Sequence, residues 1–536
     1  TLARESQNLD IFRFAAGGFR DFTRIAGSDP SMWHDIFLAN EQGILSALDS
    51  FSQGVERLKS AIVTHDSDAI LGILTRAQVA RHHFTHMLAA TAYQKTMNTK
   101  NLQFVVEAGG TLQGNLRVPG DKSISHRSIM LGSLAEGVTE VTGFLEGEDA
   151  LATLQAFRDM GVVIEGPKNG GVRIHGVGLH GLQAPPNALY VGNSGTSMRL
   201  LSGILSAQKF DTVMTGDASL SKRPMERIAK PLRQMGAMIQ TTGEKGTPPV
   251  SIKGNQALKG ITYDMPVASA QVKSGVLLAG LWAEGETVVT EPAPTRDHSE
   301  RMLRGFGYEV KTEGSTIRIR GGGKLTATNI DVPADISSAA FFMVGASIAP
   351  NADVILEHVG INPTRIGVIN ILRAMGGDLT LLNEREVGGE PVADIRVRSA
   401  KLKGIQINEA DVPLAIDEFP SLFIAAACAE GTTVLTGAEE LRVKESDRIQ
   451  VMADGLITLG IDAQPTPDGM IIQGGQLGGG KVVSHGDHRI AMSFAIAALR
   501  ANGTIEIEDC ANVATSFPLF VELARGAGLK IKVLEV

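Results

Sequence analysis

Residues 154–165 read LQAFRDMGVVIE, a helical pattern that ends at Gly161 and passes at once into alternating apolar residues. A glycine after the last turn permits the left-handed conformation that closes many helices, and the alternation is typical of a strand with one buried face. The same succession occurs six times from residue 102 onward, at intervals of roughly 70 residues. The six glycines are Gly161, Gly236, Gly307, Gly376, Gly460 and Gly528.

Each repeat also contains an earlier helical stretch rich in small apolar residues, such as SIMLGSLAEG (128–137), VLLAGLWAEG (276–285) and SFAIAALRANG (493–503). Helices that are apolar on all sides are buried. A short β-rich run such as TVVTE follows most of them. Repeats of solenoid proteins run to about 20–50 residues, so these larger mixed units favour an α/β protein of two similar halves.

Composition narrows the class of protein. The chain has 536 residues, of which 43% are hydrophobic and 20% charged, as in soluble globular proteins. No apolar run approaches the ~18 residues of a membrane span, and no signal pattern opens the chain. The net charge of −8 argues against general nucleic-acid binding. Two cysteines, Cys428 and Cys510, suit a reducing compartment, so a cytoplasmic location is expected, without a metal or disulfide framework.

Cationic residues gather just before the predicted helices, in stretches such as DKSISHR (121–127), RDH (296–298) and KESDR (444–448). Free N–H groups and the helix dipole favour anions at these positions. One such stretch would be ordinary capping. The full set predicts a site between two domains for a ligand with several phosphate or carboxylate groups. Its cations are Lys122, Arg127, Arg223, Lys273, Arg296, Lys444, Arg448 and Arg489.

Residues 102–536 resemble the 5-enolpyruvylshikimate-3-phosphate (EPSP) synthases, also called 3-phosphoshikimate 1-carboxyvinyltransferases, and in particular their second class. The resemblance rests on PGDKSISHR, GNSGTSMR, KRPM, SAQVKSG, RDHSE, NPTR, IDEFP, LRVKESDR and DHRIAMSF, in that order. It implies the enolpyruvyl transferase fold, with three βαβαββ units in each of two pseudo-symmetric domains. Residues 102–120 and 335–536 would form domain 1, and residues 121–334 domain 2.

The resemblance also implies a reaction of the shikimate pathway, which leads to chorismate and the aromatic amino acids. The enolpyruvyl group of phosphoenolpyruvate is transferred to the 5-hydroxyl of shikimate 3-phosphate, and phosphate is released. The methylene carbon must gain a proton and the hydroxyl must lose one, before phosphate and a methyl proton leave. Two proton-handling groups and an anion clamp suffice for this chemistry, with no metal or organic cofactor.

Site residues follow from the resemblance, motif by motif. Asp417, Glu445 and Lys122 would be catalytic, with Asp417 as the base at the 5-hydroxyl and Glu445, together with Lys444, handling the methylene proton. Shikimate 3-phosphate would be bound by Lys122, Ser123, Arg127, Ser269, Ala270, Gln271, Arg296, Asp417 and Lys444. Phosphoenolpyruvate would be bound by Lys122, Gly195, Arg223, Gln271, Arg448 and Arg489.

Structural roles compete with several of these assignments. Asp417 taken alone fits the N-cap of a buried helix. Glu445 fits one half of a surface pair with Arg448, and Asp335 fits a cap or a hinge. His488 is expected to orient its neighbours.

Two positions of the motifs bear on ligand contacts. Thr515 stands where many relatives of the other class have lysine, so one anion contact is missing or supplied otherwise. Gly195 is retained where some glyphosate-tolerant members have alanine, so we expect sensitivity to glyphosate. Arg199 is expected to support its glycine-rich turn without touching substrate.

Residues 1–96 form an expected helical module, followed by a polar linker at 97–101. Leu45, Leu48, Val55 and Ile62 recur at helical spacing. The stretch GGFRDFTRIAGSDPSMWHDIFLAN (17–40) resembles the C-terminal helical region of the prephenate (cyclohexadienyl) dehydrogenases, which forms their dimer. This implies a fusion cut within its first partner, a homodimer through residues 1–95, and no dehydrogenase activity of its own.

Three polar residues of this module have alternative roles. Arg20 fits a remnant substrate pocket or, as we expect, plain structure. His82 and His86 have the i, i+4 spacing of metal ligands, but without a third ligand a solvated helix face is the better interpretation.

Two other functions stay open from the sequence. The related transferase acting on UDP-N-acetylglucosamine uses a loop cysteine, whereas Cys428 falls in a buried helical stretch and Cys510 follows a strand. A catalytically silent assembly module is the second. Intact Lys122, Asp417 and Glu445 argue against it.

Overall fold

The computed structural model describes residues 41–67, 102–243 and 246–535. The chain divides into two compact units, 1–92 and 93–536. In the first unit, helix α4 (Glu41–Val63) carries the expected apolar spacing and leaves Leu45, Leu48, Val55 and Ile62 about half exposed. The linker expected at 97–101, and the residues Arg20, His82 and His86, lie outside the described residues.

The second unit contains the six amphipathic helices predicted from the repeats. They are α7 (Glu148–Asp159), α9 (Glu226–Gln234), α11 (His298–Gly305), α13 (Gly367–Ala374), α15 (Arg448–Thr458) and α17 (Phe520–Ala527). Each of the six repeat glycines follows one of these helices with a positive φ, from +80° at Gly307 to +122° at Gly528. The glycine therefore ends each helix by adopting a conformation that side chains disfavour.

The six small-residue helices are the buried ones. They are α6 (Lys122–Leu134), α8 (Gly195–Leu205), α10 (Ala270–Gly280), α12 (Ile336–Ile348), α14 (Phe419–Ala427) and α16 (His488–Ala497). Every residue of α12 is buried. A mixed α/β architecture of repeated units, as predicted, is confirmed.

Two of the six sheets show the repeat in its simplest form. Strand β10 (Thr262–Asp264) runs parallel to β11 (Glu286–Thr290), and α10 connects them. The hairpin of β12 (Val310–Glu313) and β13 (Thr316–Arg320) then joins β11 in the order β10-β11-β13-β12. Strands β6 (Leu189–Tyr190), β7 (Thr212–Thr215), β8 (Met238–Thr241) and β9 (Val250–Lys253) repeat this order as β6-β7-β9-β8.

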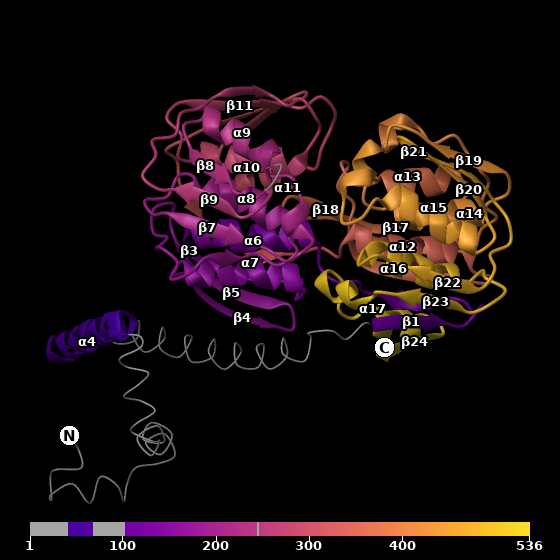
Figure 1. Cartoon of the computed structure of the whole chain (residues 1–536), viewed down its shortest axis with the longest axis horizontal. Helices are drawn as coiled ribbons and strands as arrows, with labels where there is room; N and C mark the ends of the chain where they lie inside the picture. The colour runs from indigo at the N-terminus through magenta and orange to yellow at the C-terminus, as the bar shows by residue number, and fades with distance from the viewer. Residues whose placement is uncertain (1–40, 68–101, 244–245, 536) are drawn as a thin grey trace, which may run out of the picture. The chain divides into compact units, whose positions relative to one another are not determined.

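Two other sheets are completed by strands from the start of the second unit. Strand β1 (Leu102–Val106) lies between β23 (Ile505–Glu508) and β24 (Ile531–Glu535), and β22 (Gly480–Val483) adds the outer edge (Figure 1). Strand β2 (Gln113–Leu116) pairs in parallel with β16 (Asp353–Gly360). That sheet continues through β18 (Glu390–Arg398) to β17 (Asp378–Val387).

In each of the last two sheets, an antiparallel hairpin again joins an earlier strand. Strands β3 (Ala135–Thr142), β5 (Gly171–Val177) and β4 (Val163–Lys168) receive β14 (Leu325–Thr326) and β15 (Ile330–Asp331) from much later in the chain. Strands β19 (Thr432–Leu435), β21 (Gly469–Gln473) and β20 (Asp462–Thr466) form the sixth sheet. Among the described residues, no helix combines the length and the apolar character that a bilayer crossing needs.

Two hydrophobic cores divide the second unit. One uses residues 104–118 and 334–531, and the other uses residues 124–332. The chain passes between them at Gly120 and Ala334, which form an antiparallel bridge. The Asp121 N–H donates to the Pro333 carbonyl at 2.7 Å. A Cβ on Gly120 would lie 1.9 Å from the Gly143 oxygen, so no other residue fits at this crossing.

Candidate active site

Asp417 lies in the turn before α14, where side chains of both halves meet. Arg296, from the loop before α11, donates a hydrogen bond to Asp417 Oδ2. Lys444 Nζ lies 3.6 Å from Oδ1 and Arg448 Nη1 lies 3.4 Å from it. The N-cap of α14 is Glu418, which makes no capping bond with its side chain. Asp417 is therefore a charge-paired residue and not the helix cap that its position alone suggests.

The cations around Asp417 decide its charge. Burial by itself raises the pKa of this carboxyl, but four nearby cations outweigh burial and hold the pKa well below its usual range. They are, in decreasing order of effect, Arg296, Lys444, Arg489 and Arg448. Arg489 also donates to the Asp417 carbonyl at 3.0 Å. Asp417 is ionised at neutral pH and has the charge that a base requires.

Glu445 is the second carboxylate of the site. Its Oε2 accepts a hydrogen bond from Arg448 Nη2 at 2.6 Å, and its Oε1 lies 3.4 Å from Arg223 Nη1 of the other half. Burial raises the pKa of Glu445, yet the two arginines lower it well below its usual range. The simple surface pair considered from the sequence is wrong, because the Arg448 side chain is only 1% exposed.

Arg448 connects the two carboxylates through one guanidinium. Its Nε donates to Asp487 Oδ2 at 2.8 Å, and Asp487 is completely buried. Asp487 also caps α16 by accepting from the Arg489 N–H at 3.0 Å. The fork of Arg448 is thereby fixed with one amino group toward Asp417 and the other toward Glu445.

Arg223 and Gly195 lie next to Glu445. Arg223 Nη2 donates to Asn193 Oδ1 at 2.6 Å, and Gly195 begins α8 behind the Ser194 cap. A Cβ on Gly195 would lie 2.8 Å from Arg199 Nη1 and 3.5 Å from Arg223 Nη1. The bare backbone of Gly195 thus leaves room beside two guanidinium groups.

Lys122, the first residue of α6, joins the same charge cluster. Its ammonium pairs with Asp149, and it contributes to the lowered pKa of Glu445. Burial, followed by the charge of Lys122, lowers the pKa of His488 to about 3. His488 is therefore neutral at physiological pH.

A comparison with protein-family models decides the relationship. The model "EPSP synthase (3-phosphoshikimate 1-carboxyvinyltransferase)" matches residues 106–523. This chain belongs to the EPSP synthase family. A second model, "Prephenate dehydrogenase, dimerization domain", matches residues 1–76. Both resemblances read from the sequence are confirmed.

Individual relatives within the EPSP synthase family are close. The 3-phosphoshikimate 1-carboxyvinyltransferase of Methylococcus capsulatus is 71% identical over 437 residues, which cover 82% of this chain and 100% of the relative. That of Nitrosococcus oceani is 68% identical over 431 residues, covering 80% and 97%. A solved EPSP synthase from Acinetobacter baumannii is 71% identical, with a TM-score of 0.75 over 81% of this chain and 100% of that chain.

Several residues expected at the EPSP synthase site are bonded mainly to protein groups. Arg127 donates to Ser299 Oγ at 2.8 Å and to Ser274 Oγ at 2.9 Å, and its Nη1 donates to the Ser123 carbonyl at 2.9 Å. Burial lowers the pKa of Arg127 to about 10. These bonds tie α6 to α10 and α11.

The start of α10 carries three further expected residues of the EPSP synthase site. Ser269 caps the helix by accepting from the Val272 N–H at 3.4 Å, and Ala270 is its first residue. Gln271 Nε2 donates to Thr196 Oγ1 at 2.9 Å, and its Oε1 accepts from Arg199. Arg199 therefore supports Gln271, as a residue behind the site would.

Lys273 was wrongly included among the anion-binding cations. Its ammonium is buried 3.1 Å from Glu291 and 2.7 Å from Glu300, so its charge already balances two carboxylates. Thr515 is buried and donates to the Asn512 carbonyl at 2.7 Å. Local patterns do not reveal the partners of Lys273, because Glu291 and Glu300 meet it only in the folded core.

Asp487 and Asn193 are site-supporting residues that the sequence reasoning missed. Asp487, in the motif DHRIAMSF, is the N-cap of α16, a place where Asp is a usual signal. Asn193, in the motif GNSGTSMR, comes just before the Ser194 cap of α8. A capping carboxylate has a second oxygen that can bind a cation, and in Asp487 that oxygen accepts from Arg448.

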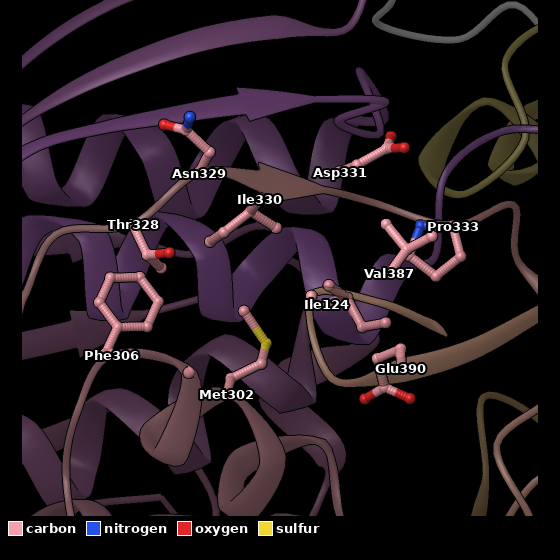
Figure 2. A pocket seen from close by; sticks show the side chains of 12 residues that line it. Ile124, Met302, Phe306, Thr328, Asn329, Ile330, Asp331, Pro333, Val387 and Glu390 are labelled. Atoms are coloured by element: carbon pink, nitrogen blue, oxygen red, sulfur yellow. The ribbon is translucent and has the colours of Figure 1, made fainter. Parts of the chain in front are cut away.

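A pocket near the crossing between the halves is a different feature (Figure 2). It is lined largely by apolar residues, among them Ile124, Met302 and Phe306, and its charged members are Asp331 and Glu390. No lysine or arginine lines it, so it does not suit an anionic substrate. Among the described residues, no group of three His, Cys, Asp or Glu side chains is placed to hold a metal ion.

Proposed function

We propose that the transferase reaction of this chain takes place around the Arg448 guanidinium, with Asp417 and Glu445 as the proton-handling groups. The chain transfers the enolpyruvyl group of phosphoenolpyruvate to the 5-hydroxyl of shikimate 3-phosphate and releases phosphate. The observation that supports this site is that one buried arginine contacts both carboxylates, 3.4 Å from Asp417 and 2.6 Å from Glu445.

Both substrates are anions, and the clustered cations account for their binding. In our proposal shikimate 3-phosphate contacts Lys122, Ser123, Arg127, Ser269, Ala270, Gln271, Arg296, Asp417 and Lys444. Phosphoenolpyruvate contacts Lys122, Gly195, Arg223, Gln271, Arg448 and Arg489.

Asp417 accepts the proton of the 5-hydroxyl as the oxygen attacks C2 of phosphoenolpyruvate. Its lowered pKa makes it ionised but weakly basic. A substrate phosphate that shares the charge of Arg296 raises the pKa of Asp417 and so strengthens the base. Binding of the correct substrate thereby activates the group that deprotonates it.

The methylene carbon of phosphoenolpyruvate receives a proton in the same step. Glu445 is ionised, so it must take up a proton before it can donate one. The phosphate of phosphoenolpyruvate, by sharing the charges of Arg223 and Arg448, raises the pKa of Glu445. The ammonium groups of Lys122 and Lys444 are the nearby proton sources in this proposal. In the second step, a methyl proton returns to Glu445 while the C2–O bond to phosphate breaks.

Phosphate release tests the proposed function. The full chain, given shikimate 3-phosphate and phosphoenolpyruvate, should release phosphate, whereas UDP-N-acetylglucosamine in place of shikimate 3-phosphate should give none. Burial raises the pKa of both cysteines, Cys428 and Cys510, to about 12, so neither has the reactive thiolate of the sugar-nucleotide enzyme. Absence of release with shikimate 3-phosphate would overturn the proposal.

Residues 102–536 form two domains in our proposal. We place domain 1 at residues 102–120 and 335–536 and domain 2 at residues 121–334. The two separate hydrophobic cores and the bridge between Gly120 and Ala334 support these boundaries.

Residues 1–95 form a homodimer interface in our proposal. The name of the matching family model, a dimerization domain, and the exposed apolar side chains of α4 support it. A chain beginning at residue 102 should be a monomer, with about two fifths of the solution mass of the full-length dimer, and should keep the same transferase activity. The same number of protomers per particle in both chains would contradict the dimer. Neither chain should oxidise prephenate.

A further inference from the structure

The segment NPTR (362–365), between β16 and α13, has no role in the site described so far. Its two longest polar side chains, Asn362 and Arg365, are 2% and 3% exposed. A buried amide and a buried guanidinium need specific partners, because an unpaired one is costly. The partners of both lie next to the residues proposed for the chemistry.

Asn362 holds the loop that presents Arg296. Its Nδ2 donates to Asp297 Oδ1 at 2.7 Å and to Glu390 Oε2 at 2.9 Å. Glu390 Oε1 lies 2.8 Å from His298 Nδ1. Asn362 and Glu390, both in the half that carries Asp417, thus fix the two residues that follow Arg296 in the other half.

Arg365 reaches the other two segments of the site. Its Nη1 donates to Asp121 Oδ2 at 3.0 Å, and Asp121 is the cap of α6 that precedes Lys122. Its Nη2 lies 3.6 Å from Glu418 Oε1, and Glu418 follows Asp417. Nη2 also donates to Ser337 Oγ at 2.6 Å. One guanidinium therefore links the segments of Lys122 and Asp417.

These contacts cross the junction between the halves. Figure 2 shows Glu390 beside Ile124 of α6 and Pro333 of the returning crossing, with which it lines one pocket. Asp121 and Asp335 stand at the two crossings, and Arg365 contacts both. A change in the relative position of the halves would therefore alter the contacts of residues 362–365.

We propose that Asn362 and Arg365 are positioning residues, which align Arg296, Lys122 and Asp417 on one another without touching substrate. This inference rests on the proposed function, since it concerns the geometry of that site. A shift of about 1 Å in a substrate-holding group is enough to cost about 100-fold in rate. Both side chains act through hydrogen bonds to the immediate neighbours of the working residues.

Asn362→Ala in the full chain tests the first half of the inference. We expect kcat/KM for shikimate 3-phosphate to fall about 10- to 100-fold. Asn370→Ala is the matched control, because Asn370 also donates to an aspartate, Asp411, at 2.8 Å but contacts no site segment. The control should keep its activity within about twofold of the wild type.

A double-mutant cycle separates positioning from a general structural effect. In an Arg296→Ala background, Asn362→Ala should cost less than about twofold further, because the residue through which it acts is gone. Equal losses in both backgrounds would overturn the assignment. If the unaltered chain released no phosphate, the proposed function itself would be wrong. If the unaltered chain were active but Asn362→Ala behaved like Asn370→Ala, only the positioning role of Asn362 would be wrong.

Arg365→Lys tests the second half and keeps the buried positive charge, so it guards against simple misfolding. We expect kcat to fall about 10-fold or more while the thermal melting curve stays cooperative. Arg385→Lys, an exposed change on β17 of the same half, is the control and should leave kcat unchanged. Wild-type kcat in Arg365→Lys would overturn the role of Arg365.

Discussion

Arg448 and Asp487 form an ion pair, Nε to Oδ2 at 2.8 Å, in which both side chains are at most 1% exposed. A guanidinium held from behind in this way keeps its two amino groups in a fixed direction. They point to Asp417 and Glu445, which come from different loops. The pair therefore sets the relative placement of the two proton-handling carboxylates.

Arg448→Lys should lower kcat/KM for phosphoenolpyruvate about 100-fold or more, because an ammonium cannot face Asp487, Asp417 and Glu445 together. Steady-state kinetics with each substrate varied in turn measures the loss. Arg442→Lys is the control: Arg442 pairs with Asp447 at 2.6 Å but is partly exposed, so its replacement should matter little. Similar losses in the two variants would show that Arg448 has no special role.

The six repeats were predictable because helix-ending glycines and strand alternation are local signals. The positions of β1 and β2 were not. Phe104 of β1 pairs with Ile507 and Val533, some 400 residues away, and no local pattern specifies such a pairing. The resemblance to a family implied the crossing, which periodicity alone did not.

The charged part of the site was also partly predictable. Cations before helix starts identified Arg223, Arg296 and Arg448 as anion-binding candidates. Lys273 has the same local pattern, but Glu291 and Glu300 neutralise it within the core. Contacts made in the folded chain decide which cation faces a ligand, and local sequence patterns do not specify those contacts.

Asp417→Asn removes the proposed base and preserves its shape. We expect kcat to fall about 10²- to 10⁴-fold, the usual contribution of general-base catalysis. Binding of shikimate 3-phosphate should not weaken, because the substitution removes a negative charge from a site that binds anions. Single-turnover kinetics and equilibrium binding together measure both effects, and normal turnover in this variant would remove Asp417 from the mechanism.

Acid should destabilise the protein through His126. Burial, followed by the charges of Lys122 and Arg127, lowers the pKa of His126 to about 3 in the folded chain, against 6.5 for an ordinary histidine. The unfolded state therefore binds a proton below pH 6.5 that the folded state refuses. Its contribution to stability is complete above pH 6.5 and falls by about 1.4 kcal/mol per pH unit as the pH drops toward 3.

His126→Gln keeps a polar partner for Thr153 Oγ1, which lies 2.8 Å from His126 Nδ1, and removes the titration. Urea unfolding at pH 6.5 and pH 5.5 should show a loss smaller by about 1 kcal/mol in the variant. His180→Gln, at an exposed position, serves as the control. An unchanged pH dependence in His126→Gln would mean that other groups cause the acid sensitivity.

Gly195→Ala should separate phosphoenolpyruvate from the larger anion glyphosate. The new Cβ would lie 2.8 Å from Arg199 Nη1, the end of a flexible side chain that can yield, so the variant should fold. The wild type is expected to be inhibited by glyphosate. A methyl group in a filled site costs about 1–3 kcal/mol, so the inhibition constant should rise about 10- to 100-fold, and more than KM for phosphoenolpyruvate does. Gly305→Ala, whose Cβ would meet nothing within 4 Å, should change neither quantity. Equal rises in the inhibition constant and KM would mean that the methyl group crowds both ligands alike.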